Sequence, residues 1–134
     1  MESLLLRLAD QAFLWFHAAL VVFNLFGWIW APLRKAHLVS LVLTAGSWFV
    51  LGLFYGIGYC PLTDWHFDVL RRLGVHDLPR SYITYLIGRT TGLSPDPALV
   101  ELATAIGFFA AVAAAIVVQV VQIVTRRRVA GRRA

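Results

Sequence analysis

The chain alternates long apolar stretches with shorter polar ones, and three of the apolar stretches contain no Asp, Glu, Lys or Arg. These are residues 11–31, 37–57 and 102–124. At a rise of about 1.5 Å per residue, each stretch is about 31 to 35 Å long as a helix, which matches a bilayer hydrocarbon core of roughly 30 Å. The pattern therefore predicts an all-α membrane protein with three transmembrane helices.

The polar stretch between the first two spans is short. It consists of Pro32, Leu33, Arg34, Lys35 and Ala36. A connection of this length usually joins antiparallel neighbours. We therefore expect the first two spans to form an antiparallel helical hairpin.

The segment between the second and third spans, residues 58–97, is too polar to cross a membrane and too apolar to be a free linker. This intermediate polarity predicts two short helices that lie at the membrane interface or re-enter the membrane. The second of them is expected over residues 79–89. Ser94 and Pro95 then suit the N-cap and the first residue of the last helix.

The first of these short helices is expected over residues 64–73, with Thr63 as its N-cap. Helical spacing places Trp65 and Leu70 on an apolar face and His66 on the opposite, polar face. This pattern is typical of an amphipathic helix that lies on the bilayer surface.

The composition leaves little material outside the spans. The chain has 134 residues, of which 60% are hydrophobic and 14% are charged, so we expect a single membrane domain over residues 1–134. The first span exceeds the usual signal-peptide core and lacks a small-residue cleavage site, so we interpret it as a retained helix. Cys60 is the only cysteine, which excludes an intramolecular disulfide and a Cys-x-x-Cys redox pair.

The net charge of +5 comes largely from the end of the chain. Five arginines follow the third span: Arg126, Arg127, Arg128, Arg132 and Arg133. A basic cluster beside a span acts first as a topology signal and an anionic-lipid contact, so we expect no nucleic-acid partner. With this tail in the cytoplasm, seven Lys and Arg lie inside and five outside. We therefore expect a multi-pass protein of the bacterial inner membrane with its N-terminus outside.

Small residues recur at four-residue intervals on two spans. They are Gly52 and Gly56 on the second span, and Ala103, Gly107, Ala111 and Ala115 on the third. Such faces let helix backbones approach closely inside lipid. Two interpretations stay open, namely docking against another subunit and packing within the same three-helix unit.

Few polar residues interrupt the spans. In an antiparallel hairpin Asn24 lies level with Thr44, so we expect an inter-helix hydrogen bond between them, at a gain of about 0.6 to 2 kcal/mol. His17 is level with Gly52 and is flanked by aromatic residues. It could be an axial ligand of haem or chlorophyll, or a neutral histidine that is hydrogen-bonded inside the bundle.

A second histidine for a haem is missing at that depth, because His37 lies about 21 Å from His17 along the membrane normal. Cys60, Asp64, His66 and His76 gather in the outer segment, but their spacing matches no strong zinc pattern. No nucleophile elbow, phosphate-binding loop or pair of carboxylates within a span is visible. We therefore expect neither a metal site nor a catalytic site.

Several short strings carry a family resemblance. They are Phe16-His17, Ala36-His37-Leu38, Tyr59-Cys60-Pro61-Leu62-Thr63 and Leu70-Arg71-Arg72. Over about residues 13–107 the chain resembles a family of small bacterial inner-membrane proteins, a domain of unknown function. The Cys-Pro-Leu-Thr string is its most specific element. The resemblance implies three spans with an outer interfacial segment and supplies no activity.

Members of that family usually carry a Glu-His pair in the re-entrant segment. The matching stretch here is Tyr82-Ile83-Thr84-Tyr85, which has neither residue. This departure argues against a catalytic or metal role for that stretch.

The leading hypothesis is a non-catalytic accessory or structural subunit that packs against a larger bacterial energy-converting or transport complex and contacts membrane lipids. The alternative is a haem- or chlorophyll-binding protein that uses His17. A third hypothesis is a small membrane enzyme or carrier that uses Cys60, His66 and His76. The sequence does not identify a cofactor.

Overall fold

The computed structural model describes residues 1–133, which form helices joined by short loops and contain no strand. The α-helices are α1 (Glu2–Phe26), α2 (Arg34–Ala45), α3 (Gly52–Tyr55), α4 (Pro61–Arg72), α5 (Tyr82–Thr91) and α6 (Pro97–Arg133). Two 3₁₀ turns, η1 (Gly27–Ile29) and η2 (Ala31–Leu33), join α1 to α2, and a π-helical segment, η3 (Gly46–Leu51), joins α2 to α3. The predicted all-α class is confirmed.

Three helical stretches are long and apolar enough to cross a membrane, namely Glu2–Ile29, Ala31–Tyr55 and Pro97–Arg132. Their number agrees with the sequence prediction and is compatible with a multi-pass membrane protein. The first and last helices extend beyond the charge-free runs. Residues 2–10 continue the first helix because most of them are strong helix formers despite their charges.

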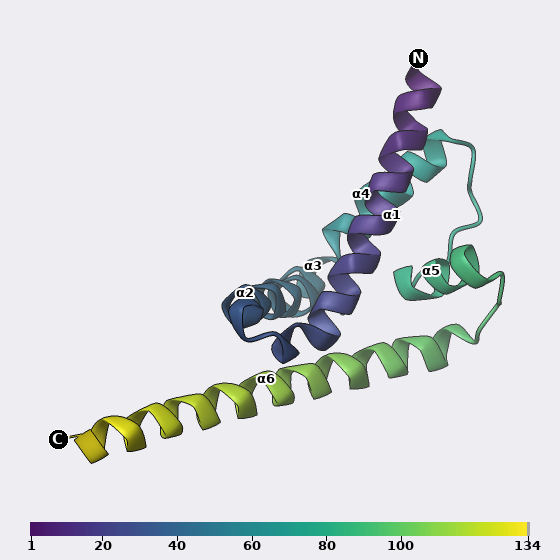
Figure 1. Ribbon diagram of the computed structural model, residues 1–134. Coiled ribbons are helices and arrows are strands. Elements are labelled where there is room, and N and C mark those ends of the chain that lie inside the picture. The colour runs from purple at the N-terminus through teal and green to yellow at the C-terminus, as the bar shows by residue number, and fades with distance from the viewer. Residues whose placement is uncertain (134) are drawn as a thin grey trace.

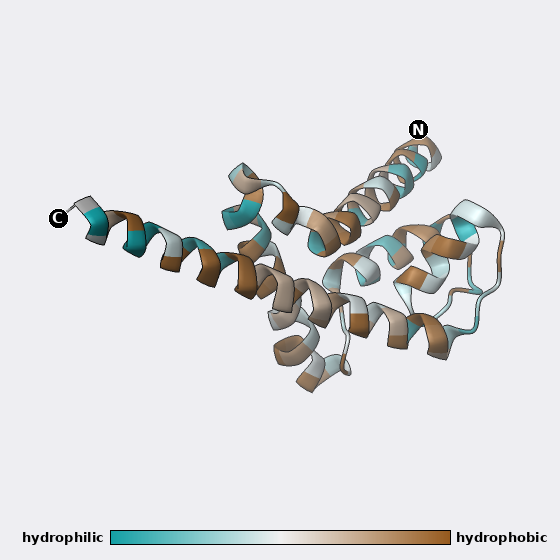
Figure 2. Cartoon of the chain, turned by 60° about the horizontal axis from the view of Figure 1, so that its bottom comes forward, coloured by the Kyte–Doolittle hydropathy of each residue, from teal (hydrophilic) through white to brown (hydrophobic). Residues whose placement is uncertain are grey.

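Much of the long helices is brown in Figure 2, which marks hydrophobic residues, and many of these residues are exposed. Leu53 and Phe54 are each 79% exposed. Such extensive apolar exposure is rare on soluble monomers and is what contact with lipid or with a partner requires. The teal end of α6 in Figure 2 carries the arginines.

The helices α1 and α2 do not form the expected antiparallel hairpin. In Figure 1, α1 lies along the plane of the picture, whereas α2 is seen almost end-on. The two 3₁₀ turns between them redirect the chain, so the helices cross and then diverge. All side-chain hydrogen bonds between α1 and α2 involve Asn24.

The long helix α6 closes one side of the molecule and extends beyond it at its C-terminal end (Figure 1). It packs on α2 through a buried cluster of Leu41, Phe108 and Ala115. On the other side, Gly107 lies against α1, where a Cβ atom would be 3.2 Å from Leu25 Cδ2. Small residues on α6 therefore serve close packing within this chain.

The short helices α4 and α5 pack together and against the N-terminal half of α1. Their buried cluster consists of Phe67, Leu70 and Tyr82. The expected helix over residues 79–89 is thus present as α5, displaced toward the C-terminus, with Ser81 as its N-cap.

Two expected helix starts are wrong. Helix α4 begins at Pro61 with Cys60 as N-cap, because proline suits the first helical position, so Thr63 is inside the helix. Helix α6 begins at Pro97 rather than at Pro95. The Asp96 carboxylate there accepts the backbone N–H of Ala98 at 2.8 Å and caps the helix.

Candidate functional site

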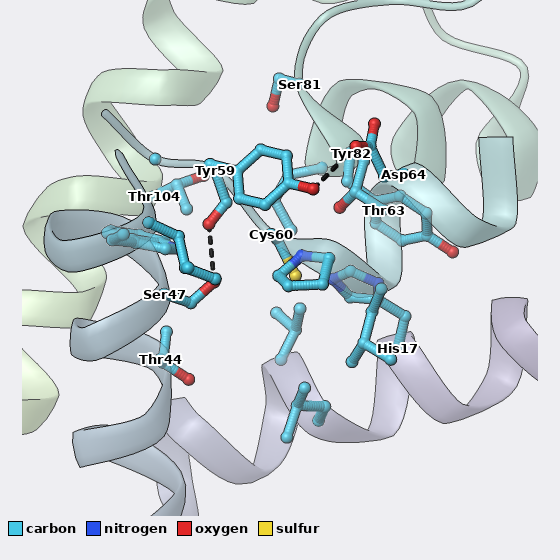
Figure 3. A pocket seen from close by; sticks show the side chains of 18 of the residues that line it. His17, Thr44, Ser47, Tyr59, Cys60, Thr63, Asp64, Ser81, Tyr82 and Thr104 are labelled. Atoms are coloured by element: carbon cyan, nitrogen blue, oxygen red, sulfur yellow. Dashed lines mark hydrogen bonds between the residues drawn. The ribbon is translucent and has the colours of Figure 1, made fainter. Parts of the chain in front are cut away.

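A large cavity of about 1420 Å³ lies between α1, the η3 segment, the loop before α4, and α6 (Figure 3). It exceeds the roughly 300–1,000 Å³ of most small-molecule sites. It extends from the crossing of α1 and α2 toward the loop before α4, since Asn24, Thr44 and Tyr59 all line it. Its apolar lining includes Leu20, Val21, Leu43, Phe108 and Phe109.

Another part of the cavity wall, near Tyr59, is polar. Ser47 Oγ, in the π-helical segment, donates a hydrogen bond to the backbone oxygen of Tyr59 at 2.7 Å, and Tyr59 Oη donates to Asp64 Oδ2 at 2.8 Å (Figure 3). Gly56 and Gly58 have φ angles of 105° and 85°, which let the loop turn sharply between α3 and α4. The loop is therefore held between η3 and the first turn of α4.

The hydrogen bond between Tyr59 and Asp64 also changes the acidity of the Tyr59 phenol. That bond, supported by desolvation and by the negative charge of Asp64, raises the pKa of Tyr59 to about 12. Tyr59 is neutral at neutral pH, as an unperturbed tyrosine also is, and its hydroxyl donates to Asp64.

Behind the Tyr82 side of the cavity lies a buried polar network. His66 has no exposed surface, and its two ring nitrogens lie 2.8 Å from Tyr82 Oη and 2.9 Å from Asp10 Oδ1. Burial raises the pKa of Tyr82 above its ordinary range, and the phenol, which is protonated at neutral pH in any case, donates to His66 Nδ1 when the His66 proton is on Nε2. His66 Nε2–H then donates to Asp10, whose residue is 5% exposed.

Arg89 completes the network from the C-terminal end of α5. Its guanidinium donates to Asp10 Oδ2 at 3.0 Å and to Tyr85 Oη at 3.0 Å. Partial burial alone would lower the pKa of Arg89, but Tyr85 and Asp10 raise it above its ordinary value. The buried carboxylate therefore has both a guanidinium and an imidazole partner, which ties α1 to α4 and α5.

His17 lies between this network and the cavity. Its ring stacks on Tyr82 with 3.7 Å between ring centroids and an interplanar angle of 12°. The residue is 6% exposed, lines the cavity, and has a buried Nδ1 atom without a hydrogen-bond partner. It is not paired across from Gly52, which packs against Ile57. The reason is that residues of α1 and α2 match in depth only near the crossing.

The predicted polar pair of the spans, Asn24 and Thr44, lies where α1 and α2 cross. Asn24 Nδ2 donates to Thr44 Oγ1 at 2.9 Å, so the expected hydrogen bond is present, and Asn24 Oδ1 also accepts from Ser40 at 2.6 Å. His37 is 1% exposed and bonds the backbone oxygen of Asn24 at 2.9 Å. Asn24 thus bonds all three residues of α2 at the crossing, whereas His37 Nδ1 is buried without a hydrogen-bond partner.

The two expected faces of small residues are only partly present in the structure. Ala111 and Ala115 are buried within this chain, whereas Ala103 is exposed. Gly56 lies at the end of α3 with a positive φ angle, so Gly52 and Gly56 do not form the expected continuous face. The glycine breaks the helix there because the loop turns at that point.

The predicted basic tail is part of α6. Arg126, Arg127, Arg128 and Arg132 are exposed near its C-terminal end. The side chain of Arg133 and residue 134 lie outside the described part of the chain.

The polar network is where the sequence prediction was incomplete. His66 was expected on a solvated face, but the face of α4 that packs inward consists of His66, Phe67 and Leu70. Asp68 stays exposed as expected, whereas Trp65, expected on the apolar face, is 59% exposed. Asp10, Tyr82 and Arg89 were not proposed at all. The available signal was the spacing of Asp10 and His17, which are seven residues apart and therefore share one face of α1.

Groups of three or more His, Cys, Asp and Glu side chains that could hold a metal ion are absent from residues 1–133. His66 takes part in the network with Asp10 and is wholly buried, whereas Cys60, Asp64 and His76 line the cavity. The network and the cavity wall are thus two separate polar regions.

Comparisons with known proteins give one match. The model of a family described as "Protein of Unknown function (DUF2784)" matches residues 7–121. No curated protein and no solved structure matches the chain. The match includes the cavity, the loop before α4 and the whole buried network.

Proposed function

Because the chain belongs to the DUF2784 family, whose description assigns no function, we propose a function from the chain's own geometry: it binds one amphipathic lipid. The apolar chains occupy the cavity between α1, the η3 segment and α6, and the polar head lies at the Tyr59 wall. The single observation that carries this proposal is the cavity of about 1420 Å³.

The two ends of the cavity support an amphipathic occupant. Leu20, Leu43 and Phe108 form part of an apolar wall that suits acyl chains, whereas Ser47, Tyr59 and Asp64 supply hydrogen-bonding groups. A site of mostly apolar lining with a few placed polar groups is the usual form of a binding site. The proposed role is binding, without catalysis.

The proposed location is the bacterial inner membrane, with the N-terminus outside and the C-terminus in the cytoplasm. Three apolar helices are compatible with a multi-pass protein. The exposed arginines at the end of α6 support the orientation, because basic residues beside a span favour the cytoplasmic side. They also suit contact with anionic lipid headgroups.

The test is native mass spectrometry of the full chain purified in mild detergent. Ala105 lines the cavity, so Ala105→Phe fills part of it and should reduce lipid occupancy about tenfold through overpacking. Ala113→Phe is the matched control, because Ala113 is on the same helix and is exposed outside the cavity. A wild-type chain that carries no lipid, even after lipid is added, would disprove the proposal.

A second function is favoured by the end of α6, which extends beyond the other helices (Figure 1). Exposed apolar residues there are Ile116, Val117, Val120, Val121, Ile123 and Val124. We propose that this face contacts a larger membrane complex, as an accessory subunit would. Copurification in mild detergent followed by mass spectrometry tests this function, and a lone monodisperse monomer would count against it.

A further inference from the structure

The mouth of the cavity carries both a free positive and a free negative group. Asp64 and Arg80 line the cavity and flank the loop between Gly56 and Cys60. Asp64 bonds Tyr59 in that loop, and Arg80 Nη2 lies 4.0 Å from the position of a Cβ atom on Gly56. A ligand headgroup with a single charge would form a favourable ionic contact with only one of these two side chains.

The negative side is suited to an ammonium group. Asp64 Oδ2 accepts from Tyr59, which leaves Oδ1 without a hydrogen-bond partner within residues 1–133. Tyr59, whose hydroxyl bonds this carboxylate, stacks on Tyr55 with 4.6 Å between ring centroids, and both rings line the cavity. Aromatic faces next to a carboxylate attract cations, and a primary ammonium can also donate to the free oxygen.

The positive side is suited to a phosphate group. Arg80 forms no salt bridge within the described residues, in contrast to Arg71, which also lines the cavity but is bonded to Asp68 at 2.8 Å. A guanidinium presents several N–H donors in a plane and binds phosphate oxygens well. Arg80 is therefore the guanidinium available at this mouth.

We propose that the head of the bound lipid is a zwitterionic phosphodiester with a primary ammonium, such as phosphoethanolamine. Its phosphate lies against Arg80, and its ammonium lies against Asp64 and the Tyr59 ring. This inference rests on the proposed function, because it names the head of the lipid whose chains occupy the cavity. Phosphatidylglycerol has the same phosphate without the ammonium, so it leaves Asp64 unmatched and places a net negative charge beside that carboxylate.

The experiment compares phosphatidylethanolamine with phosphatidylglycerol of identical acyl chains, each titrated into the delipidated full chain in detergent and measured by native mass spectrometry. We expect the wild-type chain to bind phosphatidylethanolamine about tenfold more tightly. Asp64→Asn should reduce this preference to about twofold or less, whereas Arg80→Gln should weaken the binding of both lipids.

Asp77→Asn is the matched control, because Asp77 is exposed, lies outside the cavity and forms no ion pair within the described residues. It should keep the full preference. Equal binding of the two lipids, or tighter binding of phosphatidylglycerol, would overturn the headgroup assignment while leaving lipid binding intact. Failure of both lipids to bind would instead contradict the proposed function, so the two failures are distinguishable.

Discussion

Asp10 is a carboxylate inside a largely apolar protein, and its position is tolerated because both of its oxygens have cationic or N–H partners. His66 bonds Oδ1 and Arg89 bonds Oδ2. A buried ionic group without such partners costs several kcal/mol. The network therefore ties α1, α4 and α5 together, since its three side chains come from these three helices.

His66→Ala should destabilise the protein by about 3 kcal/mol, because it leaves both the Asp10 carboxylate and the Tyr82 hydroxyl short of a buried partner. The measurement is denaturant unfolding in mild detergent. His76→Ala is the comparison, because His76 is exposed and should change the free energy of unfolding by less than about 0.5 kcal/mol. Equal effects of the two substitutions would show that the network contributes no stability.

The titration of Tyr59 reports on the cavity wall. Its phenol should ionise near pH 12, and Asp64→Asn should move the ionisation toward the ordinary value of about 10, because the raised pKa comes mainly from Asp64. Phenolate absorbance measures this, with Tyr59→Phe identifying the contribution of this one residue. An unchanged titration in Asp64→Asn would mean that the two side chains are not bonded.

The alternative role of His17 remains a prediction. If His17 is an axial ligand, the purified protein should show a visible haem or chlorophyll absorption band that His17→Ala abolishes. If the histidine only packs against Tyr82, the pigment content should be the same in both proteins. A band that survives the substitution would exclude His17 as the ligand.

Among the elements, α1 and α2 approach closely where they cross, at Gly27 and His37. Gly27, at the end of α1, is buried against the His37 ring of α2, which in turn bonds Asn24. A backbone approach this close requires the absence of a Cβ atom. The crossing point is thereby fixed, and the cavity extends from it toward the loop before α4.

Gly27→Ala should lower the free energy of unfolding by about 1–3 kcal/mol, because the added Cβ would lie 2.6 Å from His37 Cδ2. Gly46→Ala is the control, in the η3 segment that follows α2. Its Cβ would meet nothing within 4 Å, so it should be neutral or stabilising by up to about 1 kcal/mol. Denaturant unfolding in detergent compares them, and a neutral Gly27→Ala would contradict the close approach.

For the whole molecule, the proposed topology of three crossings puts the chain ends on opposite sides of a membrane. In a Cys60→Ser background, Ser3→Cys should react with an impermeant maleimide added outside cells, and Ala130→Cys should react only after lysis. This outcome follows from the odd number of crossings and from the basic end of α6. Labelling of both positions from one side would contradict the proposed topology.

Charge-free runs of about 21 to 23 residues were enough to predict three long apolar helices, because a bilayer sets the length of a spanning helix. The sequence also identified the Asn24–Thr44 hydrogen bond. This prediction was correct because both residues lie where α1 and α2 cross, and there the residues of the two helices are level as in an antiparallel hairpin. The antiparallel register failed for His17 because the helices diverge away from that point.

The sequence by itself thus determined the helical class, the number of long apolar helices and the family resemblance, since these depend on local periodicity and on short strings of residues. Only the tertiary structure decided which polar residues meet. Asp10 and His66 are 56 residues apart in the chain, and Asp10 and Arg89 are 79 apart. No local pattern encodes such pairs, because they depend on how α4 and α5 fold back onto α1.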